Sequence, residues 1–130
     1  MAIGTRNFVD IDVSFGAHPV TGDVLKKTGT NAVVQSVLNL IQTNHFERPF
    51  HPEIGGNIRA LLFELADNVT ASLLSEEIKD VLTNFEPRVK VIAVYVEADP
   101  DNNGYNITVE AAIQNVATPI AISTFLGRLR

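Results

Sequence analysis

The hydrophobic pattern of this chain changes its period at Pro87. Upstream, apolar residues recur at spacings of three and four over 28–42 and 69–85, which predicts two amphipathic helices. Downstream, apolar and polar residues alternate over 105–113, which predicts a strand. Because proline disfavours helical geometry in the residue before it, the second helix is expected to end at Glu86. Helices followed by strands indicate an α+β fold.

The segments after Pro87 are expected to form a meander of strands. Segment 89–96 is apolar on both faces, so it predicts a central strand that is covered on each side. Turn-forming residues at 99–104 then lead into the alternating run 105–113, which is the pattern of a hairpin. A last strand is expected over 120–126.

The N-terminal segment 9–15 alternates strictly between apolar and polar residues. This predicts an outer strand whose apolar face lies on the core and whose polar face, with Asp10 and Asp12, points to solvent. The turn-rich stretch that follows could return segment 24–26 as a hairpin partner.

A short helix is predicted at 57–64, with Asn57 able to cap it, and Thr28 or Thr30 can cap the first long helix. The whole chain, 1–130, is then expected to be a single domain of two main helices plus a short helix packed on one face of a mostly antiparallel sheet. The helical spacing places these residues on the apolar faces of the short helix and the second long helix: Ile58, Leu61, Leu62, Leu65, Leu73, Leu74, Ile78, Val81, Leu82 and Phe85.

Composition excludes several classes of protein. With 45% hydrophobic and 19% charged residues, the chain has material for a core and too little charge for disorder. The absence of cysteine excludes disulfides, thiolate zinc sites and cysteine nucleophiles. A formal net charge of −5 disfavours nucleic-acid binding. No apolar run approaches the roughly 20 residues of a membrane helix, and no secretion segment stands at the start, so synthesis and retention in the cytoplasm are expected.

The three histidines do not have the spacing of a metal site. His45 and His51 flank Glu47 in the irregular segment 43–56, but no pair is spaced four residues apart on a predicted helix, and prolines fix the chain there. His18 stands alone in a turn-rich segment. We therefore expect no metal site.

The acid pairs and nucleophile motifs of the sequence do not indicate a catalytic site either. A glycosidase needs two carboxyl groups, one with a raised pKa, and the candidate pairs are Asp10 with Asp12 and Glu47 with Glu53. Asp10 and Asp12 share the face predicted to be solvated, where both would stay ionised. No GxSxG elbow or phosphate-binding glycine loop is present.

The tripeptide Glu86-Pro87-Arg88 stands at the corner between the second helix and the following strand. Proline fixes φ there and holds its neighbours in defined directions, and Arg88 can offer a fork of donors to a carboxylate or to carbonyl groups. A helix stop with a local ion pair is the simpler interpretation, and a partner contact is the alternative. As a partly exposed charge, Arg88 is expected to contribute about 0 to 1 kcal/mol to stability.

Six blocks of residues follow one another along 8–96. They are Phe8-x-Asp10-x-Asp12 with Phe15, His18-Pro19-x-Thr21-Gly22-Asp23, a helix over 32–40 followed by Thr43, Glu47-Arg48-Pro49-Phe50-x-Pro52-x-Ile54-Gly55, Ile58-Arg59-x-Leu61-Leu62-Phe63-Glu64, and Glu86-Pro87-Arg88-Val89. This ordered series resembles the baseplate wedge family of contractile phage tails, whose members are also known as sheath initiators.

The resemblance implies a structural role and no enzymatic activity. Family members stand in six copies around the base of the tail tube, and each resembles the handshake domain of a tail-sheath subunit. The first sheath ring is thought to dock on them by strand addition. The predicted strands 9–15 and 120–126 lie near the ends of the chain, where edges are easily left free.

The resemblance also assigns candidate partner-binding residues. Glu86, Pro87 and Arg88 match a motif implicated in attachment to the core bundle of neighbouring wedge proteins, and Glu47 and Arg48 match further charged positions that shape the adjacent loop or touch a partner. The implied partners are the other wedge proteins and the sheath subunit, with no cofactor, metal, nucleic acid, membrane or small-molecule substrate.

Two other functions stay open at this point. One is a lysozyme-like glycan hydrolase of the baseplate, and the other is a regulatory binding module of the same fold. The resemblance places the chain in the baseplate of a virion tail or in a related contractile injection particle, and it does not choose among phage tails, bacteriocin-like particles and secretion machines.

Overall fold

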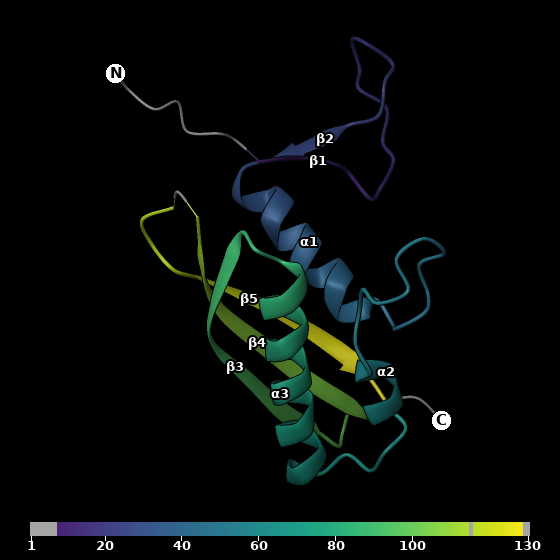
Figure 1. The fold of residues 1–130 in the computed structure, drawn as a ribbon, viewed down its shortest axis with the longest axis vertical. Helices are drawn as coiled ribbons and strands as arrows, with labels where there is room; N and C mark the ends of the chain where they lie inside the picture. Colours follow the sequence, from purple (N-terminus) through teal and green to yellow (C-terminus); the bar gives the residue numbers. More distant parts are fainter. Residues whose placement is uncertain (1–7, 115, 129–130) are drawn as a thin grey trace.

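The computed structural model describes residues 8–114 and 116–128 (Figure 1). In chain order the elements are β1 (Val9–Ile11), β2 (Lys26–Thr28), α1 (Thr30–Gln42), α2 (Ile58–Leu61), α3 (Asn68–Phe85), β3 (Val89–Asp99), β4 (Gly104–Ile113) and β5 (Ile120–Gly127). The change of period at Pro87 therefore marks the boundary between helix and strand, and the α+β prediction is confirmed.

The last three strands form an antiparallel meander in the order β3-β4-β5. This corrects the prediction that 89–96 is the central strand, because β4 occupies the centre and β3 lies at an edge. Segment 89–96 looked apolar on both faces for a local reason. The register with β4 shifts between Val91 and Ala93, and the intervening Ile92, like Tyr95, is an exposed apolar residue.

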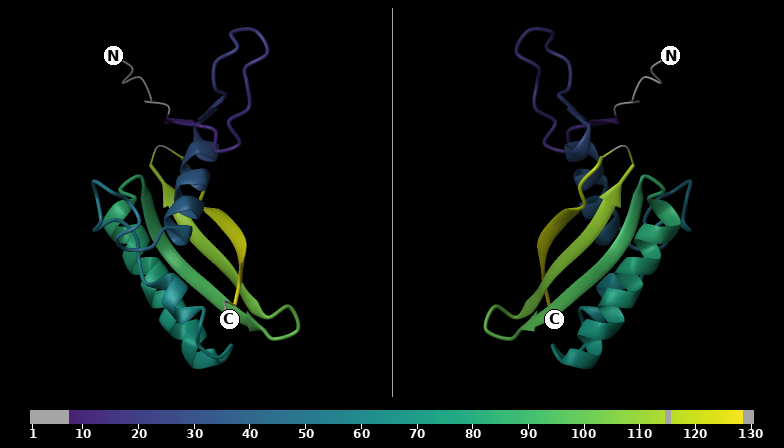
Figure 2. Two further views of the ribbon diagram at one scale, coloured as in Figure 1. Left: turned by 90° about the vertical axis from the view of Figure 1, so that its right-hand side faces the viewer. Right: turned by 90° about the vertical axis from the view of Figure 1, so that its left-hand side faces the viewer.

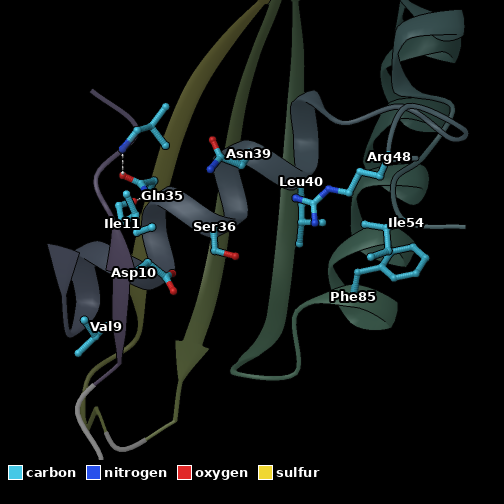
Figure 3. Close-up of a pocket in the computed structure, with 11 residues that line it drawn as sticks. Val9, Asp10, Ile11, Gln35, Ser36, Asn39, Leu40, Arg48, Ile54 and Phe85 are labelled. Carbon is cyan, nitrogen blue, oxygen red and sulfur yellow. Dashed lines mark hydrogen bonds between the residues drawn. The ribbon is translucent and has the colours of Figure 1, made fainter. Parts of the chain in front are cut away.

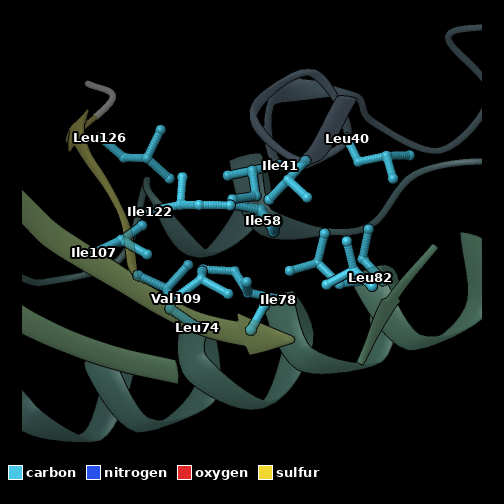
Figure 4. Packing of buried hydrophobic residues seen from close by; sticks show 14 of the residues in the cluster. Leu40, Ile41, Ile58, Leu74, Ile78, Leu82, Ile107, Val109, Ile122 and Leu126 are labelled. Carbon is cyan, nitrogen blue, oxygen red and sulfur yellow. The ribbon is translucent and has the colours of Figure 1, made fainter. Parts of the chain in front are cut away.

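The core lies between the helices and one face of this sheet (Figure 4). In Figure 2, α3 runs along the sheet, and α1 packs beside α3. Every second residue of β4 is buried, as the alternation predicts: Tyr105, Ile107, Val109, Ala111 and Ile113. The helices contribute Val33, Val37, Leu40, Ile41, Ile58, Leu74, Ile78, Val81 and Leu82.

Two leucines expected in the core are exposed. Leu73 keeps 48% of its surface accessible, because it stands one residue round the helix from the fully buried Leu74 and faces away from the sheet. Leu65 is 68% exposed, since the helical turn predicted to carry it is shorter than expected: α2 ends at Leu61. The backbone carbonyl of Leu65 instead accepts a hydrogen bond from the Tyr105 hydroxyl at 3.1 Å.

The helix caps differ from those predicted for two of the three helices. Helix α1 has Gly29, with φ of 61°, at its N-cap and therefore no side-chain cap. Asn57 stands at the N-cap of α2, as predicted, but its side chain makes no capping hydrogen bond. The left-handed backbone at the start of α1 favours glycine, which explains why Thr28 and Thr30 do not take the position. Asp67 caps α3, where its carboxylate accepts a hydrogen bond from the Thr70 N–H at 2.8 Å.

The N-terminal hairpin projects beyond the first turn of α1 (Figure 1), and β1 pairs with β2 in a separate two-stranded sheet. Here the predicted orientation is wrong. Val9 and Ile11 are 53% and 60% exposed, whereas Asp10 turns inward. Because β1 does not lie on the main sheet, no apolar surface draws its valine and isoleucine inward, and Asp10 is instead attracted by an arginine of the domain.

The hairpin is also shorter and differently paired than predicted. Strand β1 ends at Ile11 rather than near Phe15, and it pairs with 26–28. Of the predicted partner segment 24–26, Lys26 pairs with Ile11 in this ladder and Val24 makes a single bridge to Ala17. Within the described ranges, none of the helices is long and apolar enough to cross a membrane.

Candidate docking site

The carboxylate of Glu86 is the central group of a polar cluster at the end of α3. Glu86 is only 3% exposed, and its N–H closes the helix on the Leu82 carbonyl. Its carboxylate accepts hydrogen bonds from Arg88 Nε at 2.7 Å and Arg88 Nη2 at 3.0 Å. The Ser36 hydroxyl of α1 donates a further hydrogen bond to it. Glu86 therefore joins α3 to α1.

Arg88 extends this cluster to the N-terminal hairpin. Its Nη1 lies 3.4 Å from Asp10 Oδ2, and its guanidinium carbon lies 5.4 Å from the centre of the Phe8 ring. Proline at position 87 sets the corner that turns Glu86 and Arg88 toward each other. The side chain of Arg88 is 23% exposed, as expected for a partly exposed charge, whereas the side chain of its partner Glu86 is only 3% exposed.

The pKa values of this pair follow from the contacts. Burial opposes ionisation of Glu86, but hydrogen bonds from Arg88 and Ser36 outweigh it and lower the pKa of Glu86. The Glu86 carboxylate likewise raises the pKa of Arg88 against the opposing effect of burial. Both groups are thus charged at neutral pH and bind each other within the protein.

A groove of about 520 Å³ opens beside this cluster (Figure 3). Its walls come from β1 and the residues after it, from α1, from the loop 43–56 and from the end of α3: Val9, Asp10, Ile11, Val13, Gln35, Ser36, Asn39, Leu40, Arg48, Ile54 and Phe85. Gln35 holds the hairpin wall in place, because its amide donates to the Ile11 carbonyl at 2.8 Å and accepts from the Val13 N–H at 3.3 Å.

The structure separates the two charged residues of the loop 43–56. Glu47 turns back into the loop, where its carboxylate accepts a hydrogen bond from the Asn44 N–H at 2.9 Å. Arg48 reaches from the loop toward α1 and lines the groove (Figure 3). Across the described ranges 8–114 and 116–128, its side chain makes no hydrogen bond or ion pair. Glu47 therefore shapes the loop, and Arg48 is available to a partner.

Two adjacent glycines fit this loop against α3. Gly55 has φ of 117°, and a Cβ there would lie 2.7 Å from the Thr43 carbonyl oxygen. A Cβ on Gly56 would lie 2.4 Å from Val81 Cγ2 of α3. Only glycine permits both approaches. Because they fix the base of the loop, they also fix the position from which Arg48 extends.

The described part of the chain contains no cluster of three or more metal-ligating side chains. His18 Nδ1 accepts from two backbone N–H groups of its own turn, and His51 contacts Glu53 at 3.3 Å. A hydrogen bond from the backbone of Glu53 lowers the pKa of its carboxyl group, the opposite of what a general acid requires. Asp10, from the other candidate pair, is bound to Arg88.

Sequence reasoning missed how Glu86 and Arg88 connect to the rest of the fold. Ser36 stands among uncharged residues of a helix, and Asp10 lies 78 positions before Arg88, so no local spacing links them. The alternation of 9–15 even pointed Asp10 the wrong way. The only available signal was that Phe8 and Asp10 belong to the first of the ordered blocks and Arg88 to the last.

The fold matches those of a putative tail lysozyme and of chains in two contractile baseplates. A chain described as a putative tail lysozyme from Geobacter sulfurreducens matches with a TM-score of 0.70 and 20% identity, over 77% of this chain and 91% of that one. A chain of the post-contracted pyocin R2 baseplate matches with a TM-score of 0.60 and 24% identity, over 77% and 98%. A chain of the anti-feeding prophage baseplate matches with a TM-score of 0.65 and 21% identity, over 95% and 88%.

Sequence comparison defines the family. The profile described as baseplate wedge protein gp25 matches residues 27–118. The baseplate wedge protein gp25 of Enterobacteria phage T4 is 32% identical over 97 residues, which cover 75% of this chain and 72% of that protein. This chain belongs to the baseplate wedge protein gp25 family, and it is a structural component of a contractile-tail baseplate.

Proposed function

We propose that this chain starts sheath polymerisation by strand addition along β5, while the region around Glu86-Pro87-Arg88 attaches it to the core of the wedge. The proposal gives the domain two binding surfaces. The sheath binds at one of them, and the wedge core binds at the other. It treats the chain as a non-enzymatic binding protein that stands in six copies around the tail tube.

The composition of β5 carries the first half of this proposal. Soluble proteins protect edge strands with charges, prolines or bulges, because an unpaired edge templates further strands. The edge strand β3 has Lys90, Glu97 and a shift in its register. The other edge, β5, contains no charged residue or proline in its eight residues and pairs with β4 in one continuous register. An extended arm of a sheath subunit fits such an edge through backbone hydrogen bonds.

The cluster around Glu86 supports the second half. Its carboxylate is too deeply buried to meet a partner directly, so the Glu86–Arg88 pair acts by holding the surface around it. Pro87 is exposed at the corner, and Arg48 stands on the adjoining groove. We place the wedge contact on this exposed surface, with Glu86 and Arg88 as its internal support and Glu47 as the support of the loop.

Paired lysines on β5 test the strand addition. Ala121 and Ser123 are exposed alternate residues of β5, and lysines there give the strand the protection that it lacks. In a mixture of baseplates and sheath subunits, Ala121→Lys/Ser123→Lys should abolish sheathed tubes in electron micrographs. The matched control, Ala60→Lys/Ser72→Lys, changes exposed residues of the same types elsewhere and should leave the sheath intact. Normal sheath on the β5 variant would exclude this edge.

The substitution Arg88→Lys tests the attachment to the wedge core. Arg88→Lys keeps the positive charge but loses the fork that grips Glu86, so the surface around it should loosen. We expect less of the co-expressed wedge proteins to co-purify with Arg88→Lys, and an unchanged amount with Arg59→Lys. Circular dichroism provides the folding control. Full retention of the wedge complex would show that the corner is only a helix stop.

A further inference from the structure

The exposed face of α1 carries no charge. The helix, Thr30–Gln42, has no acidic or basic residue at any position. Its outward side presents the exposed Asn31 and Gln42 and the half-buried Val34, Gln35, Leu38 and Asn39. A surface helix of a globular protein normally places charged residues on its solvated side, as α3 does with Glu76, Lys79 and Asp80. Depletion of charge is instead the signature of the buried centre of a protein interface.

Hollows run along both sides of this face. The groove of about 520 Å³ lies on one side, and a second hollow of about 420 Å³ lies on the other. Both are lined by Val13, Gln35 and Asn39, so a ridge along Gln35 and Asn39 separates them. The hairpin meets the Gln35 end of this ridge through Val13. The uncharged side of α1 extends for about 16 Å from Asn31 to Gln42, at 1.5 Å per residue.

The pattern of side chains along α1 suits a helix better than an extended strand. Asn31, Gln35 and Asn39 form one row at four-residue spacing, and Val34, Leu38 and Gln42 form a second. Rows of this kind accept the side chains of another helix between them. An extended strand would need free backbone groups to pair with, and a helix satisfies its backbone groups internally.

The charges at the border of the face define what the partner must carry. Asp10 and Glu86 are both bound by Arg88, and Glu47 is bound by the Asn44 N–H. Arg48 alone reaches the groove with its charge uncompensated by any residue in the described ranges. A carboxylate on the partner would form an ion pair with Arg48. A second copy of this chain would bring another Arg48 and no free acid from these positions, which disfavours self-association.

We propose that the outward face of α1 docks a helix of another baseplate wedge protein, which lays an uncharged stripe along α1 and places an aspartate or glutamate against Arg48. This inference rests on the proposed attachment to the wedge core and names the surface and the chemistry of its partner. The N-terminal hairpin bounds the docking face through Val13, and the loop 43–56 bounds it through Arg48.

The test is co-purification of this chain with the wedge proteins encoded beside it, co-expressed as the probe. Asn39→Lys puts a charge on the ridge, and Asn84→Lys makes the same change on the exposed side of α3. Arg48→Glu reverses the charge at the border of the face, and Arg59→Glu does so elsewhere. We expect Asn39→Lys and Arg48→Glu each to reduce the recovered complex by about tenfold or more, and both controls to retain it.

The outcomes separate this inference from the proposed function. Wild-type levels of complex with Asn39→Lys and Arg48→Glu, together with loss on Arg88→Lys, would overturn the α1 face and leave attachment at the corner intact. Failure of the wild-type chain to capture the wedge proteins would overturn both. A dimer of the isolated chain that Asn39→Lys converts to a monomer would show that a second copy covers the face, which would also overturn the proposal. Arg48 lies on an exposed loop, so Arg48→Glu keeps the test valid even if Asn39→Lys perturbs α1.

Discussion

At the scale of single residues, Arg88 does more than its position at a helix end suggests. It neutralises a buried carboxylate, holds Asp10 of the hairpin and covers the ring of Phe8. An exposed ion pair contributes little to stability, but a buried carboxylate without its partner is costly. The sequence showed that Glu86 and Arg88 could pair, and it could not show that Glu86 is buried, because burial depends on α1 and on Ser36.

Replacement of Arg88 should therefore destabilise the protein more than a surface pair would. Arg88→Ala leaves the Glu86 carboxylate buried without the guanidinium, with only the Ser36 hydroxyl and the backbone N–H of residue 88 as donors. We expect a loss of about 3 kcal/mol in the free energy of unfolding. Urea titration followed by circular dichroism measures it. Addition of Glu86→Gln should recover part of the loss, since it removes the unpaired charge. A loss below about 1 kcal/mol would show that water reaches the carboxylate.

The same pair predicts a dependence on acid. The pKa of Glu86 is lowered from its usual value of 4.5, so its ionised form contributes stability above that pH and loses the contribution as the pH falls through the folded-state pKa. The difference in unfolding free energy between the wild type and Glu86→Gln should be largest near neutrality and shrink in acid. An equal difference at pH 7 and pH 3 would contradict the assignment.

At the scale of elements, the periodicity of the sequence located the helices well and the neighbours of the strands poorly. The prediction of α1 and α3 succeeded because each helix has an apolar stripe of the right spacing, and Pro87 marks where α3 gives way to β3. The central position assigned to β3 was wrong because a bulge and exposed residues such as Ile92 imitate a strand that is buried on both faces. Hydrophobicity reports burial, and it does not report which strand lies beside which.

Two leucines of α3, Leu82 and Leu73, provide a matched measurement of that stripe. Leu82 is fully buried, so Leu82→Ala should cost about 2 to 5 kcal/mol through the lost contacts and the cavity left behind. Leu73 is half exposed, and Leu73→Ala should cost less than about 1 kcal/mol. Thermal or urea unfolding distinguishes them. Similar costs for the two substitutions would mean that the helix is rotated relative to this structure.

At the scale of the whole molecule, the candidate site joins segments that are far apart in the chain. The groove is built from β1, α1, the loop 43–56 and the end of α3, and the ordered blocks of the sequence supply each of these pieces. Family resemblance could therefore identify Arg48 and Arg88 as candidates, while physical reasoning from spacing alone could not assemble them. The uncharged face of α1 was visible in the sequence, but it became informative only when its outward side was known.

The position of the hairpin provides a test at this scale. Asp10 and Gln35 are the groups that hold β1 to the domain at Arg88 and α1. We expect Asp10→Asn to speed proteolytic cleavage within residues 14–24 severalfold while 30–128 stays resistant. The control Asp23→Asn makes the same change at a carboxylate whose side chain accepts only a local hydrogen bond from the Val24 N–H, and it should cleave at the wild-type rate. Equal rates for the two variants would show that the ion pair does not restrain the hairpin.

The contact between Asp10 and Arg88 also has a consequence for how the chain is made. A ribosome releases Asp10 long before Arg88 exists, and the partner that fixes the hairpin appears only once α3 is complete. The hairpin is therefore synthesised first, but its ion pair forms only after residue 88 has been added. A nascent chain that stalls before residue 88 holds its hairpin through Gln35 without the second anchor at Arg88, so unfinished copies carry a less restrained hairpin than those ready to enter a baseplate.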